Sequence, residues 1–137
     1  MTTTNALQFP ISEAPAMGQP LKVAEGVYWL RMPLPFALNH INLWLLEDHL
    51  GWTIVDTGIN TSTCKELWQQ VFDHHLNNKP VHQLIVTHLH PDHVGLAGWI
   101  CAPNQMPDSR RCSTVQPIPM PRCARSISRT AQRRLPI

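Results

Sequence analysis

Short runs of branched and aromatic residues, bounded by Pro, Gly, Asn or Asp, recur along the first part of the chain. Such runs are typical of β-strands. The last run has a continuous apolar centre, Leu84-Ile85-Val86, which is typical of a strand buried on both faces. A polar turn at residues 48–51 separates the second run from the third and predicts a hairpin. The predicted strands are residues 26–32, 42–47, 52–56 and 81–87.

The hydrophobic period changes between the third and fourth predicted strands. Apolar residues recur at helical spacing from Leu67 to Leu76, behind a run of N-capping residues at 61–63. This pattern predicts a helix from about Ser62 to about Leu76. The polar stretch at residues 77–80 ends in proline and is expected to stop the helix.

A strand, a helix and a strand in this order form a right-handed crossover, so the strands at 52–56 and 81–87 should be parallel. Binding sites in such sheets form at the carboxyl ends of the strands. The third strand ends in Asp56-Thr57-Gly58, and the fourth is followed by His88. Both polar ends are therefore expected at the same edge of the sheet, ahead of a second helix near 94–100.

Composition divides the chain near residue 100. The part before it contains four Lys or Arg and eight Asp or Glu, whereas the part after it contains seven Arg and one acid. All the histidines, glycines and aromatic residues lie before that position. We therefore predict a flexible leader at residues 1–20, a folded domain at 21–100 and an Arg- and Pro-rich, irregular or disordered tail at 101–137.

The length of 137 residues and the hydrophobic content of 43% are typical of one modest globular domain. No apolar run has membrane-spanning length, and the first residues lack the pattern of a secretory signal. The four cysteines show no close pairing that would indicate a disulfide framework. These features predict a cytoplasmic protein without membrane association, and they leave its oligomeric state open.

Four residues of metal-ligand type crowd together where the fourth predicted strand ends. His88 and His90 are two positions apart, so they point the same way on an extended segment. Pro91 then turns the chain, and Asp92 and His93 project from the turn. This spacing suits two adjacent metal ions better than one. Imidazole and carboxylate ligands without thiolate favour zinc, iron or manganese, with zinc the commonest choice.

His88-x-His90-x-Asp92-His93 resembles the HxHxDH signature of the metallo-β-lactamase superfamily, and Val55–Gly58 resembles the strand end that precedes it. The resemblance implies an α/β fold, the N-terminal half of an αββα sandwich with a metal site at one edge. It implies that His88 and His90 bind the first metal ion and that Asp92 and His93 bind the second. In the family Asp92 would also act in proton transfer.

The same resemblance implies that Asp56 orients a ligand histidine through a hydrogen bond. A role as a capping or turn residue is an equal alternative for Asp56. The implied reaction is hydrolysis of a small-molecule thioester, ester or phosphodiester with two zinc ions, or iron or manganese in their place. Such ions lower the pKa of bound water to about 7 and polarise the oxygen of the bond under attack.

The chain departs from the family pattern after the signature. The family's second half supplies further ligands, but no histidine follows His93, and Asp108 carries the only later carboxylate side chain. The composition of the tail resembles a GC-rich gene translated in the wrong frame. We hypothesise a frame shift or misassembly shortly after Trp99 or Ile100. The alternative to a hydrolase is therefore a truncated, catalytically inactive fragment that lacks the second-half ligands.

Other polar residues receive simpler interpretations. A nucleic-acid-binding role for the Arg-rich tail is disfavoured, because the tail lacks lysine and aromatic residues for stacking. Cys64 is interpreted as a packing residue. The three tail cysteines lack the CxxC pairs of a structural zinc site; they are Cys101, Cys112 and Cys123. The remaining histidines are interpreted as ordinary polar residues; they are His40, His49, His74, His75 and His82.

Overall fold

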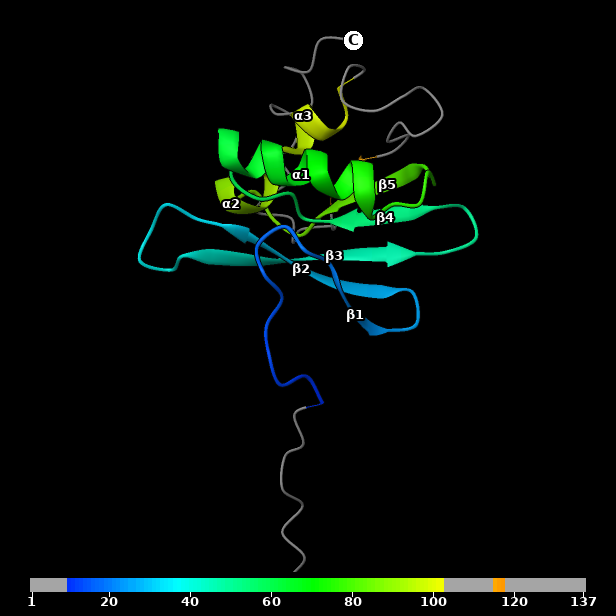
Figure 1. The fold of residues 1–137 in the computed structure, drawn as a ribbon. Helices are drawn as coiled ribbons and strands as arrows, with labels where there is room; N and C mark the ends of the chain where they lie inside the picture. Colours follow the sequence, from blue (N-terminus) through cyan, green and yellow to red (C-terminus); the bar gives the residue numbers. More distant parts are fainter. Residues whose placement is uncertain (1–9, 103–114, 118–137) are drawn as a thin grey trace, which may run out of the picture.

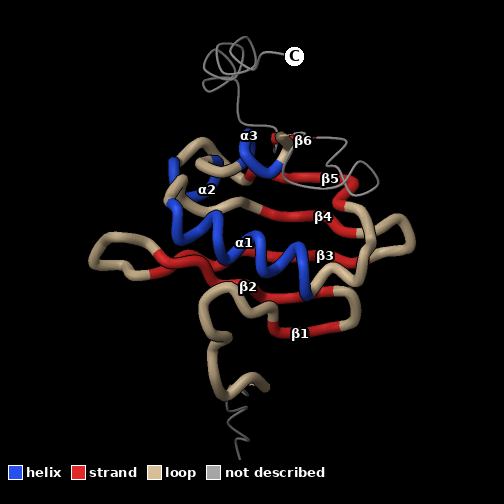
Figure 2. The backbone as a smooth tube through the Cα atoms, turned by 45° about the horizontal axis from the view of Figure 1, so that its top comes forward, coloured by secondary structure: helices blue, strands red, loops and turns tan. Residues whose placement is uncertain are grey.

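A mixed β-sheet with helices on one face forms the framework of the protein (Figure 1). The structure is a computed structural model that describes residues 10–102 and 115–117. Six strands follow one another across the sheet in chain order (Figure 2). The strands are β1 Leu21–Ala24, β2 Val27–Pro33, β3 His40–Glu47, β4 Trp52–Val55, β5 Val81–Val86 and β6 Val115–Pro117. Strands β1 to β4 pair antiparallel, whereas β4, β5 and β6 are parallel.

Helix α1, Ser62–His74, connects the parallel strands β4 and β5 and lies across the sheet (Figure 2). Its N-cap is Thr61, whose hydroxyl accepts a hydrogen bond from the Cys64 amide at 3.2 Å. His75 caps its carboxyl end. Two short helices, α2 (Pro91–Val94) and α3 (Ala97–Ile100), follow β5. The predicted helix, the parallel crossover and the α/β class are therefore confirmed, and the second predicted helix is divided into two.

The four predicted strands are confirmed as β2 to β5, but the sheet extends beyond them on both sides. Strand β1 has four residues and pairs with β2 through a register irregularity. Strand β6 lies within the predicted tail and pairs with β5 between Leu84 and Val86. Residues 101–102 of the predicted tail follow α3 directly and are described as well. Tail residues 103–114 and 118–137, including Asp108, lie outside the described residues. So do residues 1–9 of the predicted leader. The frame-shift hypothesis stays a prediction.

The described part of the leader lies against β2. The Gly18 amide donates to the Arg31 carbonyl at 2.8 Å, and Met17 forms a bridge with Arg31. Gly18 has a φ of 71°, and a Cβ at this position would lie 2.7 Å from Leu67 Cδ2. Glycine is therefore needed for this segment to approach both β2 and α1.

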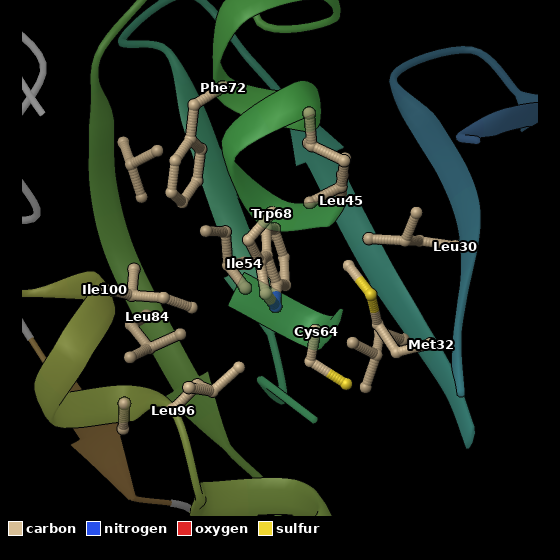
Figure 3. Packing of buried hydrophobic residues seen from close by; sticks show 14 of the residues in the cluster. Leu30, Met32, Leu45, Ile54, Cys64, Trp68, Phe72, Leu84, Leu96 and Ile100 are labelled. Carbon is tan, nitrogen blue, oxygen red and sulfur yellow. The ribbon is translucent and has the colours of Figure 1, made fainter. Parts of the chain in front are cut away.

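The hydrophobic core fills the space between one face of the sheet and the helices (Figure 3). Alternate residues of β2 and β3 are buried, as expected for strands with one face in the core. On the other face Trp44 is 38% exposed, and Ile85 of β5 is only half-buried. The sequence pattern therefore overstated burial on the second face of β5. The labelled core residues include Leu30, Met32, Leu45, Ile54, Trp68, Phe72, Leu84, Leu96 and Ile100.

Within the described part of the chain, no helix is long and apolar enough to cross a membrane.

Candidate metal centre

The ends of β4 and β5 meet at one edge of the sheet, as the crossover predicts. The Asp56 amide donates to the Ile85 carbonyl at 2.8 Å, which continues the parallel pairing one residue beyond β4. The Thr87 amide in turn donates to Asp56 Oδ1 at 2.8 Å. The side chain of Asp56, which follows β4, therefore binds the backbone of Thr87, which follows β5 and immediately precedes the predicted ligands.

Asp56 is a buried carboxylate, with 4% of its surface exposed and a positive φ of 61°. Its Oδ2 atom accepts hydrogen bonds from the Thr87 hydroxyl at 2.7 Å and from His93 Nδ1 at 2.8 Å. These bonds and the Thr87 amide give both carboxylate oxygens partners, which a buried charge requires. The structure thus shows the contact to a predicted ligand histidine and the turn conformation together.

The contact with Asp56 fixes which nitrogen of His93 carries the proton. A carboxylate only accepts hydrogen bonds, so Nδ1 must donate. In the neutral ring the lone pair then lies on Nε2. This nitrogen lies 3.5 Å from Asp92 Oδ2. One nitrogen and one carboxylate oxygen are therefore close together and available for a shared ion.

His88 and His90 form the second close pair. His88 Nε2 lies 3.0 Å from His90 Nδ1, and the two rings meet edge to face. Two imidazole nitrogens bound at about 2.05 Å to one tetrahedral zinc ion lie about 3.4 Å apart. The observed separation is close to this value, so the pair fits a shared ion after a small opening. The His93 ring packs beside His88, with ring centroids 3.8 Å apart.

All four predicted ligands and Asp56 therefore lie at one sheet edge. In residues 10–102 and 115–117, however, no three or more His, Cys, Asp or Glu side chains are arranged so as to hold a metal ion. The described donors approach one another as two pairs, His88 with His90 and Asp92 with His93. The chemistry of this donor set fits zinc, and metal binding by these four residues stays a prediction.

Thr57 fixes the backbone of the segment that carries the second pair. Its amide and its hydroxyl both donate to the His93 carbonyl at 2.8 Å, and the hydroxyl accepts from the Leu96 amide at 3.1 Å. The Thr57 carbonyl accepts from the Trp68 indole of α1 at 2.7 Å. Thr57 is fully buried and therefore joins β4, α1 and α2 at one point.

Gly95 allows the same segment to pass close to the strand end. A Cβ at this position would lie 2.9 Å from both the Asn60 amide nitrogen and the Gly58 carbonyl oxygen, and would also collide with the Pro91 carbonyl. The sequence predicts that Gly95 lets the backbone pass close behind the site, and the structure shows this close approach. Thr57 and Thr87, by contrast, were not identified from the sequence as residues that shape the site. In the sequence, the one indication of a role for Thr57 and Thr87 is that they adjoin Asp56 and His88, respectively.

The residues interpreted as ordinary by sequence lie in other environments. Cys64 is fully buried, its thiol donates to the Pro33 carbonyl at 3.4 Å, and burial raises its pKa. His82 faces Asp48 at 3.4 Å near the amino end of β5. His75 follows α1, and burial lowers its pKa.

Comparison with known proteins gives a family match that contains the whole cluster. The family model described as "Metallo-beta-lactamase superfamily" matches residues 38–108. A protein of Bacillus subtilis described as a probable metallo-hydrolase is 32% identical over 73 residues, which are 53% of this chain and 23% of that protein. An alkyl/aryl-sulfatase of Saccharomyces cerevisiae is 32% identical over 74 residues, which are 54% of this chain and 10% of the sulfatase.

Solved structures show the same relationship. A beta-lactamase domain protein from Burkholderia ambifaria aligns with 50% identity and a TM-score of 0.69, over 76% of this chain and 33% of that chain. A metallo-beta-lactamase family protein from Thermus thermophilus aligns with 32% identity and a TM-score of 0.51, over 57% of this chain and 26% of that chain. The chain thus spans a third or less of the length of these relatives.

Proposed function

Because the chain belongs to the metallo-beta-lactamase superfamily, we propose that it is a metal-dependent hydrolase that cleaves a thioester, ester or phosphodiester bond in a small molecule. The observation that carries this proposal is the arrangement at the ends of β4 and β5. Two pairs of metal-ligand side chains lie beside each other there, and a buried carboxylate bonds to one of the histidines.

We assign His88 and His90 to one ion and Asp92 and His93 to a second, with zinc as the expected metal and iron or manganese as alternatives. The chemistry that bound ions supply is a water nucleophile at neutral pH and polarisation of the oxygen under attack. Asp56 holds the proton on His93 Nδ1 and leaves Nε2 free as a donor atom. Asp92 is partly exposed and, as the catalytic residue, accepts a proton at its carboxylate during hydrolysis.

The relatives guide the choice of substrates for a first assay. One related protein is described as a metallo-hydrolase and another as an alkyl/aryl-sulfatase, so a sulfate ester belongs in the panel beside the predicted bonds. We also propose a cytoplasmic location, which rests on the cysteine pattern of the sequence; Cys64 and Cys101 are free in the described part of the chain.

The test measures bound metal and turnover on the purified full chain. Bound zinc, iron and manganese are quantified, and hydrolysis is followed with p-nitrophenyl acetate, an acyl thioester, bis(p-nitrophenyl) phosphate and p-nitrophenyl sulfate. The proposal predicts bound metal and turnover, both strongly reduced in His88→Ala. His74→Ala, an exposed residue at the end of α1, is the matched control and should change neither. Protein that shows no turnover after loading with any of the metals contradicts the proposal.

A second candidate is a catalytically inactive product that holds one metal ion weakly. Two observations favour it: the described residues contain no group of three donors, and no histidine follows His93 in the sequence. Bound metal without turnover on any substrate would support this candidate. The associated frame-shift hypothesis predicts that another frame beyond codon 100 encodes a histidine-bearing second half. Nucleotide sequencing across that region decides it.

A further inference from the structure

The hydroxyl of Thr87 lies between the buried carboxylate and the first predicted ligand histidine. Thr87 Oγ1 is 2.7 Å from Asp56 Oδ2 and 2.9 Å from His88 Nδ1. Its contact with His93 Nδ1 is longer, at 3.4 Å, and that nitrogen already donates to Asp56 at 2.8 Å. The two short contacts therefore determine the hydrogen bonding of this hydroxyl.

The protons in this chain of contacts can be assigned from the chemistry of the groups. The carboxylate only accepts, so the single hydroxyl proton of Thr87 points to Asp56. The oxygen of Thr87 then has only lone pairs to offer to His88, so His88 Nδ1 must carry a proton. The lone pair of the neutral His88 ring consequently lies on Nε2, the atom that faces His90 Nδ1 at 3.0 Å.

We propose that Thr87 is a positioning residue that transmits the charge of Asp56 to His88. One carboxylate then fixes the tautomer in both pairs of donors, directly at His93 and through Thr87 at His88. The assignment of His88 and His93 as metal ligands rests on the proposed function. The tautomer assignment rests only on the hydrogen bonds and is testable in metal-free protein.

The geometry allows the hydroxyl to be removed in isolation. The backbone amide of Thr87 donates to Asp56 Oδ1, and this bond survives in Thr87→Val, which keeps the shape of the side chain. Thr87→Ser keeps the hydroxyl and serves as the conservative variant. Thr53→Val is the matched control, because Thr53 is also a threonine with a buried side chain, and its hydroxyl makes only long contacts, with His82 at 3.4 Å and Gln83 at 3.5 Å.

The first experiment reads the tautomer by two-bond ¹H–¹⁵N correlation of histidine rings in the metal-free full chain, at a pH about two units above the ordinary histidine pKa of about 6.5. The parent and Thr87→Ser are expected to show His88 with its proton on Nδ1. Thr87→Val is expected to move the ring toward the Nε2-protonated form. Protonation of His88 on Nε2 in the parent, or an unchanged His88 in Thr87→Val, overturns the proposal. If the valine variant does not fold, protonation of His88 on Nε2 in the parent still overturns the proposal.

The second experiment measures zinc affinity by competition with a chromophoric chelator. Thr87→Val should bind about 10-fold to 100-fold more weakly than the parent, as is usual when a group that orients a ligand is removed. Thr87→Ser should stay within about 3-fold, and Thr53→Val should equal the parent. If the parent binds zinc and Thr87→Val binds it equally well, the inference about Thr87 is overturned while the proposed function stands. If the parent binds no zinc, the proposed function fails, and the metal-free spectra still decide the inference.

Discussion

Replacing Thr57 with valine removes one hydroxyl from the junction of β4 and α2 and leaves the volume of the side chain almost unchanged. The residue is fully buried, so water cannot replace the lost partner. The His93 carbonyl keeps its bond from the Thr57 amide at 2.8 Å, but the Leu96 amide loses its acceptor, the Thr57 hydroxyl at 3.1 Å. The expected consequence is one buried amide without a partner, on a residue that is itself fully buried.

An unsatisfied buried donor costs about 1–3 kcal/mol. Urea unfolding followed by circular dichroism should therefore show a lower midpoint for Thr57→Val at an unchanged m-value. With m of about 1–2 kcal/mol per molar urea, a loss of about 2 kcal/mol lowers the midpoint by about 1–2 M. Thr53→Val, in the preceding strand, removes a hydroxyl with long contacts only and should lie within about 0.5 kcal/mol of the parent. Equal midpoints for the two variants would refute the role assigned to Thr57.

Three further predictions concern the site and the opposite edge of the sheet. Asp56→Asn should weaken zinc binding about 10-fold to 100-fold in chelator competition, because a neutral amide orients the ligands less strongly; equal affinity would contradict this role. Gly95→Ala should lower the melting temperature, since its Cβ would lie 2.9 Å from the Gly58 carbonyl oxygen; a melting temperature unchanged by this variant would show that the approach is not restrictive. The hydrogen bond from Lys79 holds the pKa of Glu47 below its ordinary value. The pair therefore stabilises the fold at pH values above the ordinary carboxyl pKa, and this contribution is lost as the pH falls through the lowered pKa. Lys79→Gln should therefore lose less than about 1 kcal/mol of unfolding free energy near pH 7 and match the parent near pH 3, and an effect that grows toward acid pH would reverse this sign.

The sequence predicted the parts of the fold that have a strong periodic signal. The apolar centre of β5 and the helical spacing of α1 each determine one element, and together they require a parallel crossover. Strand β1 has only four residues, Leu21–Ala24, with no alternation strong enough to distinguish it from a loop. Strand β6 depends on main-chain pairing with β5 over three residues, which no side-chain pattern reveals.

Some residues of the candidate site could likewise be predicted from the sequence, and others could not. The four predicted ligands could be found because three histidines and one aspartate occupy six positions directly after a strand, and Asp56 could be found because it ends the neighbouring parallel strand. Thr57 and Thr87 could not be found, since threonine is common in strands and turns and its hydroxyl has no preferred partner in sequence. The contacts of Thr87 depend on Asp56, which is 31 residues away along the chain, and those of Thr57 depend on His93, which is 36 residues away.

The donors and the carboxylate that restrains them come from different parts of the chain, and this separation couples cation binding to folding. A short peptide with the four donors alone would have to restrict many rotatable bonds before it could hold an ion. In the folded chain the β4–β5 pairing has already restricted them, because it brings Asp56 to His93 across 37 residues. An ion that binds only the folded sheet edge, and not the unfolded chain, raises the free energy of unfolding of the crossover by linkage. The melting temperature should then rise with the concentration of free zinc, even where no chemical turnover takes place.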